Sequence, residues 1–225
     1  TDLANLVAAW RSATDWDAAA WIAKNQGNWL RQQMLYHIWM TNPKGWRFKD
    51  GDMWGGRTAD KTQYLMHVVT IANMYRDGFG RSYLDRSFKR WGTGDFHTQF
   101  VWEWFVFYDP TIDPRPLKDL GRLALFSPKL HGLVAMRSSW QPDATVIHFK
   151  AGEAVDHHGS GDQGKFTIFK REPLAIENGG YMDGYRGSMH NYYRYPWSSN
   201  CVVFTGEGVP GKKYKDVRLY GLQPR

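Results

Sequence analysis

Two adjacent histidines, His157 and His158, stand in a glycine-rich polar segment, AVDHHGSGDQGKFTIF, that runs into an apolar stretch. An imidazole changes its charge near neutral pH, so it can accept or release a proton under ordinary conditions. Glycine lacks a side chain, which lets such a loop pass close to a ligand. The segment therefore predicts a proton-transfer loop. The alternative is that its glycines only shape a turn and its histidines are solvated.

A second polar stretch, SMHNYYRYPWSSN, combines imidazole, amide and phenol groups ahead of the apolar run CVVF. Rings with a polar edge are typical of ligand grooves. We predict substrate contacts, with turn formation and packing as the alternative, for His190, Asn191, Tyr192 and Tyr193.

Two arginines, Arg186 and Arg137, carry guanidinium groups that can pair with an acidic ligand. We predict both as substrate contacts. The alternative for Arg186 is a solvated side chain, and the alternative for Arg137 is pairing with a carboxylate of the chain.

The balance of charge favours polyanionic partners, because 29 Lys and Arg against 22 Asp and Glu give a formal net charge of +7. Acidic polysaccharide, nucleic acid and an anionic membrane surface all fit this charge. No recognised nucleic-acid-binding motif is present, and no apolar run approaches the roughly 18 residues of a membrane-spanning helix. The single cysteine, Cys201, excludes an intramolecular disulfide.

The elements that must position these residues change type along the chain. Residues 1–108 show the apolar spacing of helices, most clearly over 58–76, where Thr58 is suited to cap the helix. One face of this helix is predicted to carry Tyr64, Leu65, Val68, Val69, Ala72 and Tyr75. Further helices are predicted near the N-terminus, after Asp15, after Asn28 and over 97–108.

The segment DPTIDPRPLK, residues 109–118, contains three prolines and is predicted as a linker between domains. After it the apolar period becomes that of strands, in the runs GLVAMRS, ATVIHFKAG, KFTIFK, PLAIEN and NCVVFT. Helices and strands are segregated, which predicts an α+β multidomain fold with helices over 1–108 and an incomplete antiparallel sandwich over 119–225.

Four blocks of the strand region resemble, in order and spacing, the heparinase II/III-like polysaccharide lyases. They are MRSSW at 136–140, HGSGDQGKF at 158–166, LAIENGGY at 174–181 and HNYYRYPWSSN at 190–200, which is followed by CVVF. The resemblance implies the end of an (α/α) helical toroid followed by the start of a β-sandwich. It also implies a secreted or periplasmic enzyme that cleaves uronic-acid-containing acidic polysaccharide by β-elimination.

The resemblance assigns roles residue by residue. His158 matches the first loop histidine of the family and is predicted to be catalytic, with His157 beside it as a substrate contact. Loop-ordering and supporting roles are predicted for Asp162, Gln163, Glu177 and Asn200. The segment FKDGDMWGGR resembles a late part of the toroid, so the family's catalytic tyrosine is expected upstream of this chain. Tyr64 and Tyr75 lie on an apolar helix face, and core packing is predicted for both.

Two departures from the family concern metal binding. Ser160 and Ser199 stand where zinc-binding members have histidines, so Glu177 is the one matching ligand that remains. A tetrahedral zinc site needs three or four good ligands. We therefore expect no cofactor, with zinc or calcium held by substitute ligands as the alternative.

Two other functions stay open. The serines at 160 and 199 favour a non-catalytic relative that binds acidic carbohydrate. Helical toroids also host glycoside hydrolases, for which Asp52 and Glu103 are the candidate carboxylates. The sequence does not specify the uronate polymer or the oligomeric state.

Overall fold

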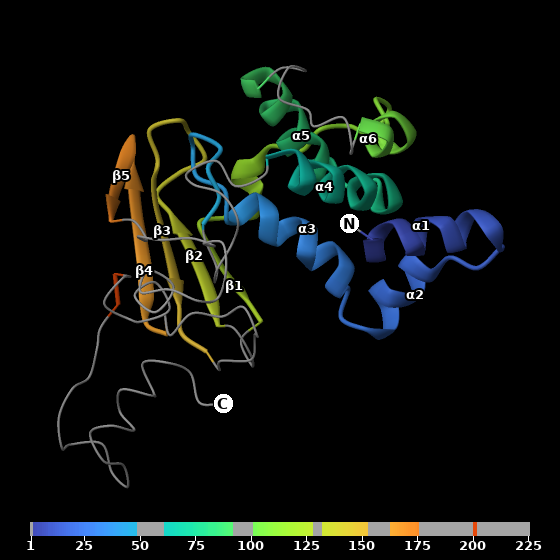
Figure 1. Ribbon diagram of the computed structural model, residues 1–225, viewed down its shortest axis with the longest axis horizontal. Coiled ribbons are helices and arrows are strands. Elements are labelled where there is room, and N and C mark those ends of the chain that lie inside the picture. Colours follow the sequence, from blue (N-terminus) through green and yellow to red (C-terminus); the bar gives the residue numbers. More distant parts are fainter. Residues whose placement is uncertain are drawn as a thin grey trace, which may run out of the picture. The chain divides into compact units, whose positions relative to one another are not determined.

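The computed structural model describes residues 2–48, 61–91, 101–127, 132–152, 163–175 and 200–201. These residues contain helices and a five-stranded antiparallel sheet, so the predicted α+β class is confirmed (Figure 1). The chain divides into two compact units. The helical unit comprises residues 1–39 and 60–121, and the sheet unit comprises residues 40–59 and 122–225.

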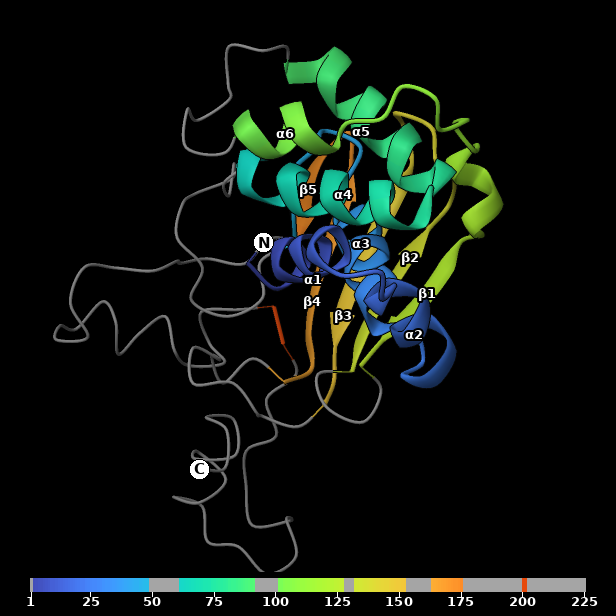
Figure 2. The ribbon, with the colours of Figure 1, turned by 90° about the vertical axis from the view of Figure 1, so that its right-hand side faces the viewer.

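The helical unit is built around one central helix. Its elements are α1 (Asp2–Ala13), α2 (Ala18–Asn25), α3 (Trp29–Trp39), α4 (Lys61–Tyr75), α5 (Gly78–Trp91), α6 (Val101–Phe107) and the short 3-10 helix η2 (Leu117–Leu120). Figure 2 shows α4 between α5 and α6 on one side and α1 and α3 on the other. Leu65, Val68, Val69 and Ala72 of the predicted apolar face of α4 are buried. Met66, His67, Thr70 and Ile71 are buried too, so this stretch of the helix is buried on all sides rather than along one face.

Polar side chains set where two of the helices begin. Asp17 caps α2 by accepting a hydrogen bond from the backbone N–H of Ala20. Asp77 does the same for α5, since its Oδ1 accepts from the N–H groups of Phe79 and Gly80. The other oxygen of Asp77 accepts from Arg31 of α3 at 2.6 Å, which joins the start of α5 to α3.

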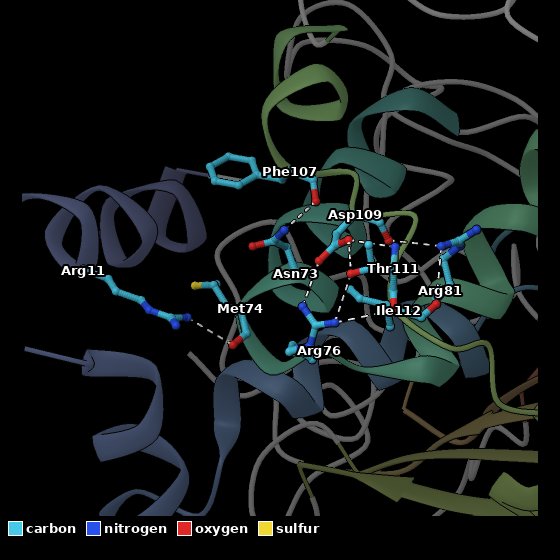
Figure 3. A network of polar contacts seen from close by, with 9 residues as sticks. All are labelled: Arg11, Asn73, Met74, Arg76, Arg81, Phe107, Asp109, Thr111 and Ile112. Carbon is cyan, nitrogen blue, oxygen red and sulfur yellow. Dashed lines mark hydrogen bonds and ion pairs between the residues drawn. The ribbon is translucent and has the colours of Figure 1, made fainter.

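The predicted linker 109–118 packs on the helices and belongs to the helical unit. Figure 3 shows its anchors: Arg76 donates to the carboxylate of Asp109, and Arg81 donates to the carbonyls of Asp109 and Ile112. Just before the segment, Asn73 donates to the carbonyl of Phe107 at the end of α6. The chain passes into the sheet unit after Gly121, three residues beyond the predicted boundary. Prolines here prevent a helix but do not make the segment independent, because Arg76, which follows α4, and Arg81 of α5 hold it by hydrogen bonds.

The sheet is a simple meander in which each strand pairs with the next. Its strands are β1 (Leu123–Phe126), β2 (Leu133–Arg137), β3 (Thr145–Lys150), β4 (Lys165–Lys170) and β5 (Glu172–Ala175). Strands β2 to β5 were predicted from alternating side chains, and the alternation is clearest in β3, where every second residue is buried. Of the predicted strand NCVVFT only residues 200 and 201 are described, and Cys201 forms a bridge with Lys165.

A segment from the predicted helical region, residues 40–48, packs in the sheet unit instead. It folds back on itself through a bridge between Thr41 and Arg47, and the side chain of Asn42 accepts from the N–H groups of Lys44 and Trp46. The ring of Trp46 lies edge-on to Phe169 of β4, beside buried Ala144 and Val146. The core of the sheet unit is therefore completed by residues that precede α4 in the sequence.

Candidate functional site

Three of the predicted site residues, Arg137, Gln163 and Asn200, lie in the part of the chain that the structure describes. The others lie outside the described residues, and their roles stay predictions: His157, His158, Asp162, Glu177, Arg186, His190, Asn191, Tyr192 and Tyr193. The same holds for Ser160, Ser199 and Asp52.

Both ends of the segment that carries the two histidines are described. Residues 153–162 connect β3 to β4, and we call the residues at its two ends, 150–152 and 163–165, the hairpin foot. The N–H of Gly152 donates to Oε1 of Gln163 at 2.9 Å, and the N–H of Gly164 donates to the carbonyl of Lys150 at 2.8 Å. The sheet and these two bonds fix where the histidine segment leaves and rejoins the fold.

Asn200 lies beside this foot, at the first residues of β4. Its carbonyl accepts from the N–H of Phe166 at 2.8 Å, and its neighbour Cys201 bridges to Lys165. Strand β5 pairs with β4 only from Ile168 onward, so residues 200–201 pair with the part of β4 that β5 does not reach. The structure thus brings Gln163 and Asn200, which are far apart in the sequence, to the same end of one strand.

The hairpin foot contains two buried lysines that the sequence analysis did not single out. Lys150 and Lys165 are directly opposite each other on β3 and β4, with exposed fractions of 2% and 0%. The ammonium group of Lys165 lies 5.0 Å from the centre of the Phe48 ring, and the buried His148 ring lies 5.0 Å from the same centre. The signal in the sequence was the run VIHFK, in which His148 and Lys150 share a face with the buried Val146.

Two buried ammonium groups need partners that stabilise their charge. Like charges directly opposite each other on neighbouring strands repel, so such a pair requires acceptor or anionic surroundings. In the described part of the sheet unit the carboxylates are those of Asp143 and Glu172, and both are exposed. Glu172 forms an ion pair with Lys44. Lys150 and Lys165 both have interaction partners within the chain.

Gln163 has an unused hydrogen-bond donor. The backbone N–H of Gly152 can only donate, so the amide atom that faces it must be the oxygen, which leaves Nε2 with both of its N–H groups. Nε2 is buried, and among the described residues it has no hydrogen-bond partner. A buried donor without an acceptor costs about 1–3 kcal/mol, so this atom is expected to bind a water molecule or another acceptor.

Arg137 makes its described contacts within the sheet unit. Its Nη2 donates to the carbonyl of Thr41 at 2.8 Å, and its guanidinium carbon lies 3.9 Å from the centre of the Trp140 ring. The first of these contacts helps to hold residues 40–48 on the sheet. The substrate contact predicted for Arg137 stays a prediction.

In the helical unit, Glu103 is buried, with an exposed fraction of 2%. Its Oε1 accepts from Asn5 at 3.4 Å, and the carbonyl oxygen of the Asn5 side chain accepts from Thr70. A glycosidase carboxylate must reach a sugar, and this one faces α1 and α4. The structure therefore gives no support to Glu103 as a hydrolase carboxylate.

The tyrosines of α4 were predicted to pack in the core. The hydroxyl of Tyr75 donates to the carbonyl of Ala19 at 3.2 Å. Burial raises the pKa of Tyr75, Asp17 adds to the rise, and Arg31 opposes it. These contacts favour the neutral phenol and a packing role. The side chain of Tyr64 lies outside the described residues.

The described residues contain neither a metal site nor a membrane-spanning helix. Among residues 2–48, 61–91, 101–127, 132–152, 163–175 and 200–201, no three His, Cys, Asp or Glu side chains come together as a metal site. In the same ranges, no helix is both long and apolar enough to cross a membrane.

Comparison with known proteins gives structural matches alone. No protein-family model matches the chain, and no curated protein matches it by sequence. The solved structure of heparinase III, the BT4657 gene product, superposes with a TM-score of 0.52 at 16% identity, over 74% of this chain and 22% of that one. This chain is similar in fold to part of heparinase III. The form of that protein with methylated lysines gives a TM-score of 0.51 at 17% identity, again over 74% and 22% of the two chains.

A third structure, the heparan sulfate lyase HepC from Pedobacter heparinus, matches with a TM-score of 0.48 at 16% identity, over 71% of this chain and 21% of that one. At these identities the likeness to heparinase III concerns the fold and indicates a distant relationship at most. The chain spans about 22% of the length of heparinase III.

Proposed function

We propose that this chain is part of a polysaccharide lyase that cleaves uronic-acid-containing acidic polysaccharide by β-elimination. The observation that carries the proposal is the hairpin foot, which fixes both ends of the histidine segment next to two buried lysines and Asn200. The fold similarity to heparinase III and the net charge of +7 support it.

The reaction needs three functions. A base removes the proton on the carbon next to the uronate carboxylate, an acid protonates the departing glycosidic oxygen, and donors stabilise the charge that develops on the carboxylate. We assign His158 to the catalytic site, and assign substrate contacts to His157, Arg137, Arg186, His190, Asn191, Tyr192 and Tyr193. Asp162, Gln163, Glu177 and Asn200 support the loop.

A second sheet is part of the proposal, because one face of the described sheet is almost entirely apolar. The register places Leu123, Met136, Ile147 and Ile168 in one row, and Leu125, Val134, Phe149 and Phe166 in the next. Leu123 and Leu125 are 66% and 56% exposed. A β-sandwich would bury this face under another sheet, and the helical unit would correspond to part of an (α/α) toroid.

The decisive test is product formation. The chain, or a longer parent that contains it, is incubated with heparan sulfate and other uronate polymers, and the absorbance of the unsaturated product is followed. We expect His158→Ala to abolish the rise, and His157→Ala to raise KM while a measurable kcat remains. An equal loss of kcat in the two variants, with unchanged thermal unfolding, would contradict the assignment of His158.

Metal removal is a separate prediction. Because Ser160 and Ser199 replace two expected histidine ligands, we propose that catalysis needs no bound metal. Dialysis against EDTA is expected to leave kcat/KM within about twofold of the untreated value, since a missing ligand pair weakens a zinc site strongly. Restoration of a lost activity by added zinc or calcium would refute this.

The second candidate function is a non-catalytic protein that binds acidic carbohydrate. The serines at 160 and 199 favour it, since they remove two imidazoles from the loop region. Binding of acidic oligosaccharide without any unsaturated product would support this candidate. In either case we propose a periplasmic or secreted location.

A further inference from the structure

We propose that two copies of this chain associate through α1 and α2, with the two α1 helices antiparallel across a two-fold axis. The starting observation is a group of large apolar side chains, on these helices and the turn between them, that are about half exposed. They are Leu3 (47%), Leu6 (60%), Trp10 (51%), Trp16 (49%) and Trp21 (44%), and we call them the N-terminal apolar face. An exposed apolar patch of this kind is typical of a protein–protein interface.

Helix α1 is apolar on two opposite sides. Ala4 and Val7 are buried against the helical unit. The exposed side carries a second apolar stripe, formed by Leu3, Leu6, Trp10 and Ala13. Its spacing of three, four and three residues is that of a helix that packs along another helix. A helix that is apolar all round belongs between two layers, and Figure 2 shows α3 and α4 on one side of α1 only.

The exposed stripe of α1 is complementary to itself. When a second α1 lies antiparallel across it, with the axis at Ala8, Leu6 faces Trp10 of the second copy. In the same register Leu3 faces Ala13 of the second copy, so a large side chain meets a small one. Each contact occurs twice, as a two-fold axis requires. The stripe therefore fits a second copy of the chain.

The charges of the chain do not oppose this contact. The chain carries a formal net charge of +7, which disfavours self-association in general. None of the stripe residues is charged, however. Their neighbour Arg11 pairs with Asp17 at 3.7 Å and donates to the carbonyl of Met74 at 3.3 Å. A surface rich in tryptophan and poor in unpaired charge has the composition of an interface core.

The area of the N-terminal apolar face is sufficient for a weak dimer. A half-exposed tryptophan presents on the order of 100 Å². The five side chains of one copy therefore offer roughly 500 Å², and two copies together bury about 1,000 Å², which is near the lower limit of specific interfaces. We expect dissociation in the micromolar range.

Sedimentation velocity tests the dimer between about 1 and 100 μM, the range expected for a small interface. The unmodified chain should reach twice the mass of one chain as its concentration rises. Leu6→Glu and Trp10→Lys should each weaken the dimer about tenfold or more, because each sets a charge against an apolar side chain. The matched control is Leu174→Glu, the same change at a residue of β5 that is 68% exposed, which should leave the dissociation constant within about twofold.

An equimolar mixture of the Leu6→Glu and Trp10→Lys variants tests the register. The antiparallel arrangement sets the new carboxylate of one chain against the new ammonium group of the other, and keeps one Leu6–Trp10 contact intact. The mixture should therefore dimerise more strongly than either variant alone, which would also show that both variants fold. A mixture that stays monomeric would overturn the antiparallel contact.

Two further results would overturn the dimer. One is an unmodified chain that stays monomeric over the whole concentration range, and the other is a loss of dimer in Leu174→Glu equal to that in Leu6→Glu. The lyase reaction is tested separately. Unsaturated product from a chain that stays monomeric supports the lyase proposal and rejects the dimer, whereas a dimer that forms no product does the reverse.

Discussion

At the scale of single residues, the geometry of the hairpin foot depends on how closely two backbones approach. Gly132 has a φ of +55°, and a Cβ placed on it would lie 1.9 Å from the carbonyl oxygen of Ala151. The carbonyl oxygen of Gly132 accepts a hydrogen bond from the N–H of Ala151. A side chain at position 132 would overlap the carbonyl oxygen of Ala151. Glycine is therefore required here both by this close contact and by the positive φ.

Gly132→Ala is therefore expected to destabilise the chain more than Gly27→Ala does. Gly27 has a similar positive φ, +63°, but nothing lies within 4 Å of the point that its Cβ would occupy, so it reports the conformational cost alone. We expect about 1 kcal/mol for Gly27→Ala and a further 1–3 kcal/mol, roughly, for Gly132→Ala, from steric overlap. Urea unfolding measures both, and equal losses would contradict the close contact.

A core residue supplies a second test at this scale. Phe169 is buried against Ala144, Val146 and Trp46. Its replacement by alanine removes a large apolar side chain and leaves a cavity, which costs about 3–5 kcal/mol. Phe105 is 89% exposed, so Phe105→Ala should change the free energy of unfolding by about 0.5 kcal/mol or less. Similar losses for the two variants would contradict the described core.

At the scale of elements, the turn after α6 is held by a single carboxylate. Oδ1 of Asp109 accepts from the hydroxyl and the N–H of Thr111, and Oδ2 accepts from Arg76, which follows α4. The hydrogen bonds from Thr111 hold the pKa of Asp109 below its usual value, and Arg76 lowers it further. A carboxylate with a lowered pKa stabilises the fold above its unfolded pKa, and this contribution is lost as the pH falls through the folded pKa.

Asp109→Asn should remove this pH dependence. The amide oxygen can still accept from Thr111, but the charge that pairs with Arg76 is gone. The melting temperature of the unmodified chain should exceed that of the variant near about pH 6, and the difference should shrink as the pH falls below about 4. If the difference in melting temperature stays constant between these two pH values, the charge of the Asp109 carboxylate does not contribute to stability.

The sequence predicted the elements whose signals are local. β3 and β4 follow from alternating side chains, and α4 follows from its apolar stripe. β1 was missed because LALF is uniformly apolar and does not alternate. The packing of residues 40–48 was missed because NPKGW looks like a turn between helices, and its partners Arg137 and Phe169 are far along the chain.

Of the candidate site, the sequence predicted Gln163 and Asn200 as neighbours of the histidine loop. It did not predict the buried lysines, since their burial depends on cross-strand pairing.

At the scale of the whole molecule, neither unit is one continuous stretch of sequence. The chain changes unit after Trp39, again after Ala59, and again after Gly121. Trp46, Phe48 and Thr41 are thus separated by the helices α4 to α6 from the strands that they contact. A fragment that begins at Arg122 contains the strands but lacks the residues that cover Phe169 and His148.

Such a fragment, residues 122–225, should be destabilised relative to the same strands in the full chain. Amide hydrogen exchange in β3 and β4 should be faster by at least about tenfold, because the loss of one buried aromatic contact costs more than about 1.4 kcal/mol. Addition of a peptide with the sequence of residues 40–48 should restore part of the protection. A peptide with Trp46 replaced by alanine is the control, and equal rescue by the two would contradict the described contact.

The early position of residues 40–48 in the sequence has a consequence for synthesis on the ribosome. Trp46 and Phe48 emerge well before β4, whose Phe169 and Lys165 they meet in the finished fold. More than a hundred further residues must be added before β4, which these two rings contact, has been synthesised. The apolar rings of residues 40–48 therefore stay exposed while α4 and α5 are being synthesised. During this interval they are open to binding by chaperones and to non-native contacts.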